Sequence, residues 1–204
     1  MTTKQSGGSS GGHIGILLFD GVEELDFAGP WEVLSWWTRG FPEDGYTCST
    51  FSADGSAVTC NKGLSVTPHH SRDELPPMAV LLHPGGDTRA LGADASHLAW
   101  LQKTRETVPL LTSVCTGSIV YARAGLLKGR PATTYWGALE GLADIDPSID
   151  VRSEDRWVDD GDVVTAAGVS AGIDMALHLV ARLAGEDRAR EVRRGIQYDP
   201  EPPV

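Results

Sequence analysis

Cysteine is scarce in this sequence, and long apolar runs are absent from it. The three cysteines, Cys48, Cys60 and Cys115, form no C-x-x-C pair, and an odd, sparse set favours a reducing compartment over a disulfide scaffold. No apolar stretch approaches the length of a membrane span, and the N-terminus lacks the basic-then-apolar layout of a secretion signal. We therefore expect a cytoplasmic protein that does not bind membranes.

Positively charged residues are also few. The chain has 17 lysines and arginines against 28 aspartates and glutamates, which gives a formal net charge of -11. Nucleic acid is not an expected partner, because phosphate binding needs a basic face. We expect no metal site either. The adjacent pair His69 and His70 would point to opposite faces of an extended segment, and the other histidines lack ligand spacing.

The length of 204 residues suits one sizeable α/β domain. We expect the leader at 1–12, rich in Gly and Ser, to be flexible, either natural or a tag remnant, and 13–204 to form the domain. Buried-strand patterns occur at 13–19, 46–52, 78–82 and 109–114, with a small hairpin at 58–66 and a turn-and-strand region at 150–167. Helical patterns occur at 28–38, 95–104, 119–124, 135–141 and 173–183. This alternation predicts an α/β fold with a mostly parallel sheet sandwiched by helices.

Cys115 directly follows a buried strand and precedes the sequence Thr-Gly-Ser and a helix. In parallel sheets, ligands bind beyond the carboxyl ends of the strands, where helix N-termini converge. A helix N-terminus lowers the pKa of a thiol, and a strand-to-helix elbow presents its central side chain outward and often strains it. We therefore predict that Cys115 is a nucleophile, although most free cysteines are core residues. Cys48 and Cys60 lack this context and are interpreted as packing or surface residues.

Two other segments end at the same edge of the predicted sheet. Gly85 and Gly86 follow a buried strand, and their backbone N–H groups could stabilise negative charge beside the thiol, although Pro-Gly-Gly is also an ordinary turn. Asp26 lies just before a predicted helix, where it could serve as an N-cap or as a catalytic acid. Local sequence leaves both roles open. The neighbouring Glu23 and Glu24 are interpreted as solvated loop charges.

The sequence Gly-Val-Ser-Ala-Gly at 168–172 matches the G-x-S-x-G motif of serine hydrolases and lies between an apolar strand and a helix. Such enzymes also need an acid and a histidine downstream on separate loops. Here the only later histidine, His178, lies one helical turn beyond Asp174 on the same predicted helix, so neither can reach back to Ser170. We interpret Ser170 as the cap of that helix.

Six motifs in order resemble those of a known family. They are Gly-Ile-Leu-Leu-Phe at 15–19, Glu-Leu-Asp-Phe-Ala-Gly-Pro-Trp-Glu-Val at 24–33, His-Pro-Gly-Gly at 83–86, Ser-Val-Cys-Thr-Gly-Ser at 113–118, Ala-Thr-Thr-Tyr-Trp at 132–136 and Gly-Val-Ser-Ala-Gly-Ile-Asp at 168–174. On these motifs the chain, from His13 nearly to its end, resembles the ThiJ/PfpI superfamily. The resemblance implies a flavodoxin-like, class I glutamine-amidotransferase-like fold with a nucleophile elbow.

Within this superfamily the sequence is most similar to the isocyanide hydratase branch. That branch has aspartate at the position of Asp26, threonine at that of Thr116, and a Tyr-x-Pro-x-Pro-Pro segment near its end, which matches 198–203 here. Many relatives have histidine where Tyr135 stands. Tyrosine cannot replace that base at neutral pH, since its usual pKa is about 10, so protease or Cys-His-Glu amidase chemistry is not expected.

The resemblance implies cofactor-free hydration of an isocyanide to an N-substituted formamide through a thioimidate on Cys115. Asp26 would donate and accept protons, and the Thr116 hydroxyl with nearby backbone N–H groups would orient the intermediate. Tyr135 and Trp136 would belong to the substrate pocket, with Trp136 in an apolar wall. The resemblance also implies a homodimer with the pocket near the subunit contact.

Two other functions stay open. One is glyoxalase III or deglycase-type chemistry on small α-oxoaldehydes, against which Asp26 and Tyr135 both count. The other is a non-catalytic redox or small-molecule sensor in which Cys115 is oxidised to sulfinate. The same module also occurs fused to a helix-turn-helix domain in AraC-type regulators. This sequence stops at Val204, and we expect no DNA-binding half.

Overall fold

The computed structural model describes residues 11–200 of the chain. Most of the predicted leader and the end of the predicted Tyr-x-Pro-x-Pro-Pro segment lie outside the described residues. The centre of the molecule is a seven-stranded sheet with the order β10-β11-β7-β6-β1-β2-β5. Its strands are β1 (His13–Leu17), β2 (Thr47–Ser52), β5 (His70–Ser71), β6 (Met78–His83), β7 (Leu110–Val114), β10 (Trp157–Asp159) and β11 (Val163–Ala166). All pair in parallel except β10, which runs antiparallel to β11 at one edge.

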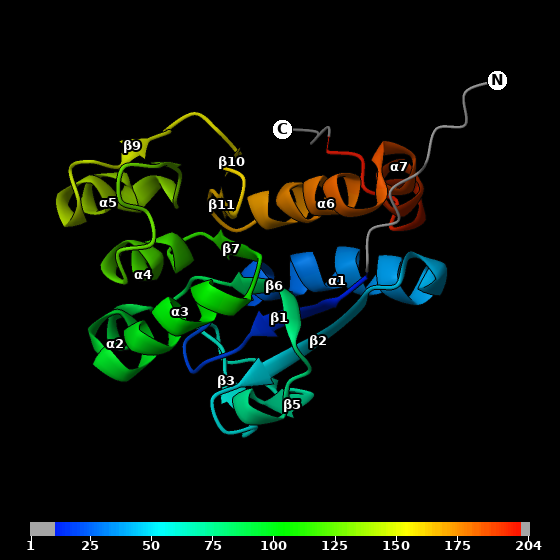
Figure 1. The fold of residues 1–204 in the computed structure, drawn as a ribbon, viewed down its shortest axis with the longest axis horizontal. Coiled ribbons are helices and arrows are strands. Elements are labelled where there is room, and N and C mark those ends of the chain that lie inside the picture. Colours follow the sequence, from blue (N-terminus) through cyan, green and yellow to red (C-terminus); the bar gives the residue numbers. More distant parts are fainter. Residues whose placement is uncertain (1–10, 201–204) are drawn as a thin grey trace.

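Helices cover both faces of this sheet (Figure 1). One face carries α1 (Glu24–Gly40), α6 (Ala171–Ala184) and α7 (Glu186–Gly195), and the other carries α2 (Arg89–Ala93), α3 (Ala95–Thr107) and α4 (Gly117–Arg123), with α5 (Leu139–Ile145) beside α4. Two small sheets pair β3 (Val58–Thr59) with β4 (Ser65–Val66) and β8 (Pro131–Ala132) with β9 (Asp150–Val151). Short 3-10 helices occur at Pro42–Asp44, Arg72–Glu74 and Trp136–Ala138. The predicted α/β fold with a mostly parallel sheet between helices is confirmed.

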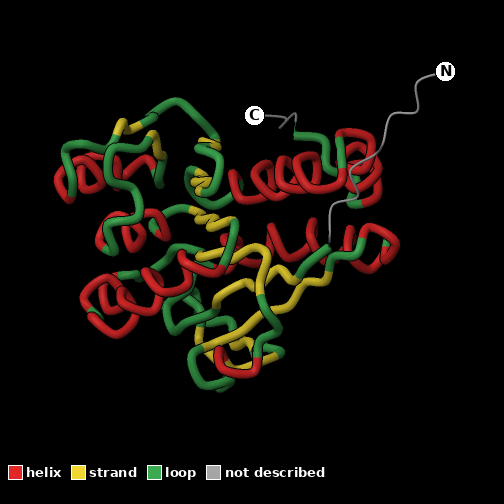
Figure 2. Tube along the Cα trace, in the orientation of Figure 1, coloured by secondary structure: helices red, strands yellow, loops and turns green. Residues whose placement is uncertain are grey.

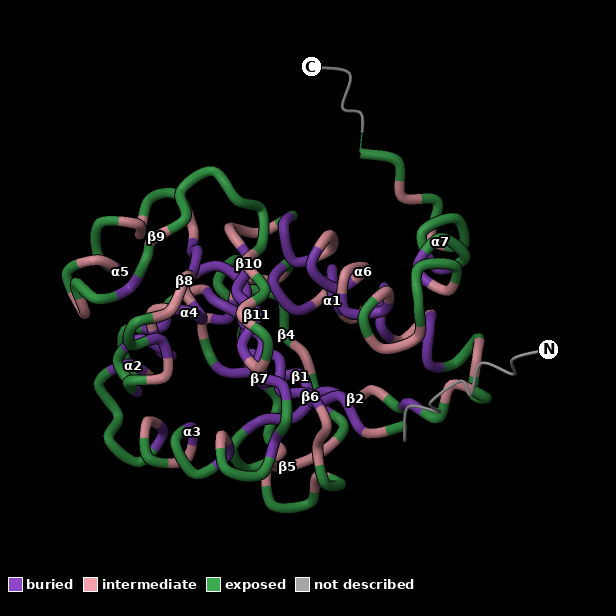
Figure 3. Tube along the Cα trace, turned by 45° about the horizontal axis from the view of Figure 1, so that its top comes forward, coloured by how far each residue is buried: buried purple, intermediate pink, exposed green. Residues whose placement is uncertain are grey.

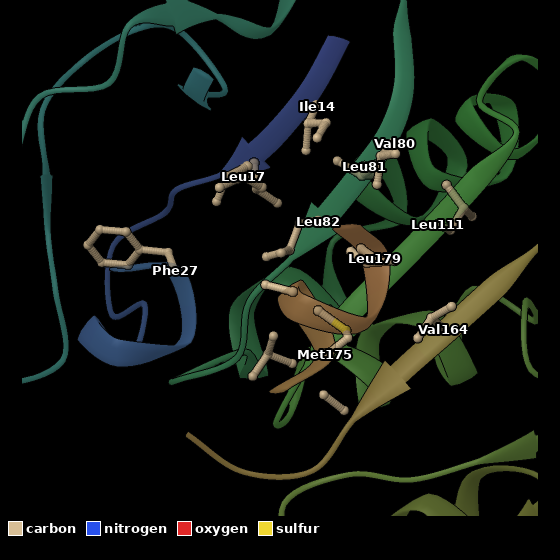
Figure 4. Close-up of a cluster of buried hydrophobic side chains, with 14 of the residues drawn as sticks. Ile14, Leu17, Phe27, Val80, Leu81, Leu82, Leu111, Val164, Met175 and Leu179 are labelled. Carbon is tan, nitrogen blue, oxygen red and sulfur yellow. The ribbon is translucent and has the colours of Figure 1, made fainter. Parts of the chain in front are cut away.

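The central strands are apolar on both faces, as a sheet covered on each side by helices requires. Ile14 and Ile16 of β1, Leu81 of β6 and Leu111 of β7 are fully buried. Figure 4 shows this cluster together with side chains from the helices, Met175 of α6 among them. Figure 3 shows that burial is concentrated in the central strands and becomes sparse toward α7. Within residues 11–200, no helix combines the length and the hydropathy that crossing a bilayer requires.

The first helix begins earlier than predicted. α1 starts at Glu24 rather than at residue 28, and Pro30 lies inside it rather than in its first turn. Proline lacks the N–H that would bond to the carbonyl of Asp26, but only this one bond near the helix start is lost and the helix continues. As a result, Asp26 belongs to the first turn of α1.

The sequence patterns also miss α2 and α7. α7 buries only Ala189 and Val192, so its apolar pattern is too sparse to recognise, and Gly185, with a φ of 97°, separates it from α6. The helix predicted at 135–141 is instead a 3-10 turn followed by α5. The loops that follow β1, β6, β7 and β11 leave the sheet at one edge, because these strands are parallel (Figure 2). The candidate site is built from these loops.

Candidate active site

Cys115 lies at the sharp turn between β7 and α4. Its φ is +56°, in the left-handed region that residues other than glycine rarely adopt, so the predicted strained elbow is confirmed. The Cys115 N–H donates to the carbonyls of Ala166 and Ala167, both at 3.1 Å. The Cys115 carbonyl accepts hydrogen bonds from the hydroxyls of Thr134 at 2.9 Å and Ser118 at 3.0 Å. These four contacts hold the turn through its main chain.

Asp26 is fully buried, and its side chain reaches the loop after β6. Its Oδ2 atom accepts a hydrogen bond from the Gly85 N–H at 2.9 Å, and the carboxyl group interacts with the Cys115 thiol. The other oxygen, Oδ1, is buried without a well-formed hydrogen bond among the described residues. Of the two roles left open for Asp26, the N-cap role is wrong, because the helix starts earlier and Glu23 occupies the N-cap position.

The surroundings of Asp26 favour its protonated form. Burial raises the pKa of the carboxyl group to about 7, and the negative charge of Glu23 acts in the same direction. The Gly85 N–H, the Cys115 thiol and the positive charge of Lys62 act in the opposite direction. A carboxyl group with a pKa near neutrality can both donate and accept protons at physiological pH.

The thiol pKa departs from the sequence-based prediction. Burial, and then the charge of Asp26, raises the pKa of Cys115 to about 12, whereas a lowered value is expected from the helix N-terminus. The backbone N–H groups of Thr116 and Val169 do act to lower it, but burial outweighs them because the residue is only 6% exposed. Since the two acidic groups are in contact, they titrate as a pair, and at neutral pH the Cys115 sulfur carries its proton.

The N–H groups of Gly85 and Gly86 are not free to stabilise developing charge, as the sequence-based hypothesis required. Gly85 donates to Asp26, and Gly86 donates to the Thr116 hydroxyl at 3.0 Å. That hydroxyl donates in turn to the Gly86 carbonyl at 3.0 Å, so the Thr116 side chain fastens the loop to the elbow. A Cβ at residue 85 would lie 2.5 Å from the Thr116 nitrogen, so glycine is required there. The N–H groups that interact with the thiol are those of Thr116 and Val169.

A cavity of about 620 Å³ reaches Cys115. Tyr135 lines it, as predicted, but Trp136 does not, because it is 76% exposed and forms no apolar wall. The remaining lining residues are Glu23, Asn61, Lys62, Gly86, Asp87, Arg89, Thr116 and Val169. Lys62 pairs with Glu23 and Arg89 with Asp87 at the mouth, so the charges there largely balance. Sequence patterns do not predict these charged residues, because they lie in loops without a motif.

The G-x-S-x-G segment forms no hydrolase triad. Ser170 occupies the N-cap position of α6, although its side chain makes no capping hydrogen bond and accepts one from Arg156 at 3.3 Å. Asp174 accepts a hydrogen bond from Arg156 at 2.6 Å, and His178 pairs with Asp159 at 2.7 Å. The serine, acid and histidine are therefore engaged separately. The residue of this segment that reaches the cysteine is Val169, whose N–H interacts with the thiol.

The described residues hold no cluster of three or more metal-ligating side chains. Cys48 and Cys60 are free thiols that do not line the cavity, half-buried and buried respectively. Burial raises the pKa of Cys48 to about 12 and also raises that of Cys60. The site is therefore an α/β sheet edge at which one cysteine, on a strand-to-helix elbow, contacts one buried carboxyl group.

This architecture defines a class of α/β proteins with a cysteine elbow, and the sequence places the chain within it. The chain belongs to the DJ-1/PfpI family, whose model matches residues 13–182. The resemblance to ThiJ/PfpI proteins is thus confirmed.

Relatives in this family have different functions. Over 192 residues the chain is 36% identical to an isonitrile hydratase of Pseudomonas putida, and the matched region covers 93% of this chain and 80% of that protein. It is 32% identical over 177 residues to the HTH-type transcriptional regulator CdhR of Pseudomonas aeruginosa, which covers 87% of this chain but only 52% of the regulator. Family membership alone therefore does not decide between enzyme and regulator.

Solved structures agree with the fold. A THiJ/PfpI family protein from Pseudomonas syringae superposes with a TM-score of 0.84 at 31% identity, over 98% of this chain and 81% of that one. Drosophila melanogaster DJ-1beta superposes with a TM-score of 0.81 at 22% identity, over 93% of this chain and 99% of that one. At that identity the second likeness supports the fold only.

Proposed function

We propose that this protein hydrates isocyanides to N-substituted formamides, with Cys115 as the nucleophile and Asp26 as the proton donor and acceptor. The observation that carries the proposal is the buried contact between this thiol and this carboxyl group beside a cavity. Among the described residues, no histidine lines that cavity. The similarity to the isonitrile hydratase of Pseudomonas putida favours the same reaction.

In the first half of the reaction, the Cys115 sulfur attacks the terminal carbon of R–N≡C and forms a C–S bond. Asp26, in its carboxylate form, takes the thiol proton and delivers it to the same carbon, which gives the thioimidate R–N=CH–S–Cys. The N–H groups of Thr116 and Val169 stabilise the sulfur while it carries negative charge. No redox step or external acid is needed.

In the second half, water adds to the thioimidate carbon. Asp26 takes one proton from the water and delivers it to the nitrogen, which gives R–NH–CH(OH)–S–Cys. The hydroxyl proton then passes through Asp26 to the sulfur as the C–S bond breaks, releasing R–NH–CHO and the free thiol. A carboxyl group whose pKa burial raises to about 7 suits these alternating transfers at neutral pH.

The test follows formamide production from an aryl isocyanide by absorbance, with reduced wild type, Cys115→Ala and Cys60→Ala. We expect turnover in wild type and Cys60→Ala and none in Cys115→Ala, because Cys60 is a buried thiol that does not line the cavity. No turnover by folded, reduced wild type rejects hydration. Methylglyoxal turnover, or selective peroxide oxidation of Cys115 without turnover, would then point to the oxoaldehyde or sensor alternative.

We further propose that the protein works as a homodimer with the cavity near the subunit contact. Three large apolar side chains, Leu25, Leu64 and Trp136, are 39%, 52% and 76% exposed. Each lies one or two positions from a residue that lines the cavity. Exposed apolar side chains in the segments that line a pocket suit a subunit contact near it. Light scattering at micromolar concentration tests this, and a monomer would contradict it.

A further inference from the structure

Two buried histidines lie behind the active-site loop and have no part in the reaction described above. His83 ends β6 and is fully buried, and His97 on α3 is 6% exposed. Their Nε2 atoms lie 3.1 Å apart, within hydrogen-bonding distance. The other ring nitrogen of His83, Nδ1, lies 2.8 Å from the carbonyl oxygen of Pro84.

These distances define the tautomers of both rings. A carbonyl oxygen can only accept, so Nδ1 of His83 carries a hydrogen and donates it to Pro84. In a neutral ring the Nε2 atom of His83 is then an acceptor, and Nε2 of His97 must donate to it. The two rings thus form a directed chain of hydrogen bonds from α3 to the end of β6.

The chain continues through a single peptide group to the active site. The Pro84 carbonyl and the Gly85 N–H belong to the same peptide, and that N–H donates to Oδ2 of Asp26 at 2.9 Å. A hydrogen bond accepted by the carbonyl polarises the peptide and strengthens its N–H as a donor. His97, His83 and the Pro84–Gly85 peptide therefore lie in one series that ends on the carboxyl group beside Cys115.

We propose that His83 and His97 are positioning residues, which hold the Pro84–Gly85 peptide so that its N–H fixes the Asp26 carboxyl group beside Cys115. Their importance for turnover rests on the proposed hydratase function, whereas their effect on Asp26 does not. The loop's other polar contacts lead elsewhere: the Glu23 N–H donates to the Gly85 carbonyl at 2.9 Å, and Gly86 bonds to Thr116. The histidine pair is thus the loop's link to α3.

Burial keeps the histidine pair neutral. Burial lowers the pKa of His83 to about 3, with His97 as its titratable neighbour, and the rings of Phe19 and Tyr121 pack against it. Burial lowers the pKa of His97 to about 4; Arg72 acts in the same direction and Asp94 opposes both. The tautomer chain therefore persists at neutral pH, where Asp26 titrates.

Substitutions can separate the effect of losing a hydrogen-bond donor from the effect of changing the size of the side chain. His83→Leu removes the donor to Pro84, whereas His83→Asn retains an N–H near the Nδ1 position. His97→Leu removes the donor to His83, and His97→Gln retains an N–H near the Nε2 position. His13 offers a matched control, because it is also a buried histidine at the end of a central strand. It bonds instead to Thr47 and Ser49, both at 2.8 Å.

The readout is the pH dependence of Cys115 alkylation by iodoacetamide, followed by mass spectrometry, which needs no isocyanide. At neutral pH the thiolate forms when the Asp26 carboxylate takes the thiol proton, so alkylation follows the loss of the first proton from the Asp26–Cys115 pair. Without the histidine donor, Gly85 stabilises the Asp26 carboxylate less, so this first proton leaves at higher pH. We expect His83→Leu and His97→Leu to raise the alkylation midpoint by about half a pH unit. His83→Asn, His97→Gln and His13→Leu should keep the wild-type midpoint. Thermal unfolding shows which variants fold.

A folded His83→Leu variant with the wild-type midpoint would overturn the proposal, and so would a shift of equal size in His13→Leu. If His83→Leu does not fold, His97→Leu decides in the same way, because it leaves the His83 ring in place. The two proposals remain distinguishable. If the alkylation midpoints of the leucine variants shift but wild type does not hydrate isocyanides, the hydratase function is rejected and the positioning role is kept. If wild type hydrates isocyanides but the midpoints do not shift, the positioning role is rejected and the hydratase function is kept.

Discussion

Arg188 on α7 and Asp44, in the 3-10 turn after α1, form a two-point ion pair, with Nε–Oδ2 and Nη2–Oδ1 distances of 2.7 and 3.1 Å. The indole N–H of Trp37 donates to the same Oδ2 at 2.7 Å, and the Arg188 guanidinium carbon lies 3.5 Å from the Phe41 ring centre. This cluster joins segments 144 residues apart. It explains how α7, which buries so little apolar surface, stays attached to the domain.

Arg188→Ala should therefore destabilise the fold without touching the chemistry. We expect a loss of about 1–3 kcal/mol in the free energy of unfolding, because charge-assisted hydrogen bonds between largely buried partners are lost. Arg190→Ala is the matched control on the same helix. Its side chain is 67% exposed and pairs with a fully solvated Asp187, so we expect a change within about 0.5 kcal/mol. Urea unfolding measures both, and equal losses would contradict the argument.

Ionisation of the buried Asp26 should lower the free energy of unfolding as the pH rises. Burial raises its pKa from 3.8 to about 7 in the folded state, so the folded state binds this proton more tightly, and its contribution to stability falls between about pH 4 and pH 7. Asp26→Asn removes the titration. We expect the free energy of unfolding of the variant to exceed that of wild type by on the order of 2 kcal/mol at pH 8 and to match it near pH 4. An equal difference at both pH values in denaturant titrations would be evidence against a raised pKa.

The same variant should impair both catalysis and thiol reactivity. Asp26→Asn removes the group that moves protons in the proposed reaction, so we expect formamide production to fall by about 10²–10⁴-fold. It also leaves Cys115 to titrate alone, with a pKa that burial raises above its ordinary value, whereas in wild type the first proton leaves the Asp26–Cys115 pair near neutral pH. The midpoint for iodoacetamide alkylation should therefore move to higher pH. A variant that retained full turnover would exclude Asp26 from the mechanism.

Two neighbouring threonines beneath the elbow make a further prediction. Both are buried, but the Thr134 hydroxyl donates to the Cys115 carbonyl at 2.9 Å, whereas the Thr133 hydroxyl oxygen has no partner among the described residues. We expect Thr134→Val to lower the free energy of unfolding by about 1–2 kcal/mol and to reduce turnover. We expect Thr133→Val to leave the stability unchanged or to raise it slightly. Thermal unfolding of both variants decides. A larger loss for Thr133→Val would reverse the assignment.

The elbow could be predicted because its signal is local. A buried strand that runs without a spacer into a helix must turn sharply, and Cys115 is the residue at the turn. The family motifs led to the same residue. Sheet class could be predicted for a similar reason, since the central strands β1, β6, β7 and β11 are short apolar runs. The sparse face of α7 supplies no such signal.

The partners of Asp26 could not be predicted, because they depend on strand order. Gly85 lies 59 residues further along the chain and reaches Asp26 only because β6 pairs with β1. The direction of the Cys115 pKa is wrong in the sequence-based prediction for a related reason. The helix N-terminus is visible in the sequence, but the depth of burial and the approach of a carboxylate are properties of the assembled fold.

The turn at residue 115 is held through its N–H and its carbonyl, and none of those bonds involves the sulfur. The scaffold therefore specifies where the reactive atom sits and leaves the identity of that atom free. Serine or alanine at this position would inherit the same backbone and the same surroundings. The fold at the elbow and the nucleophile it carries are therefore independent, so one substitution at residue 115 can change or remove the activity of such a domain while its fold stays the same.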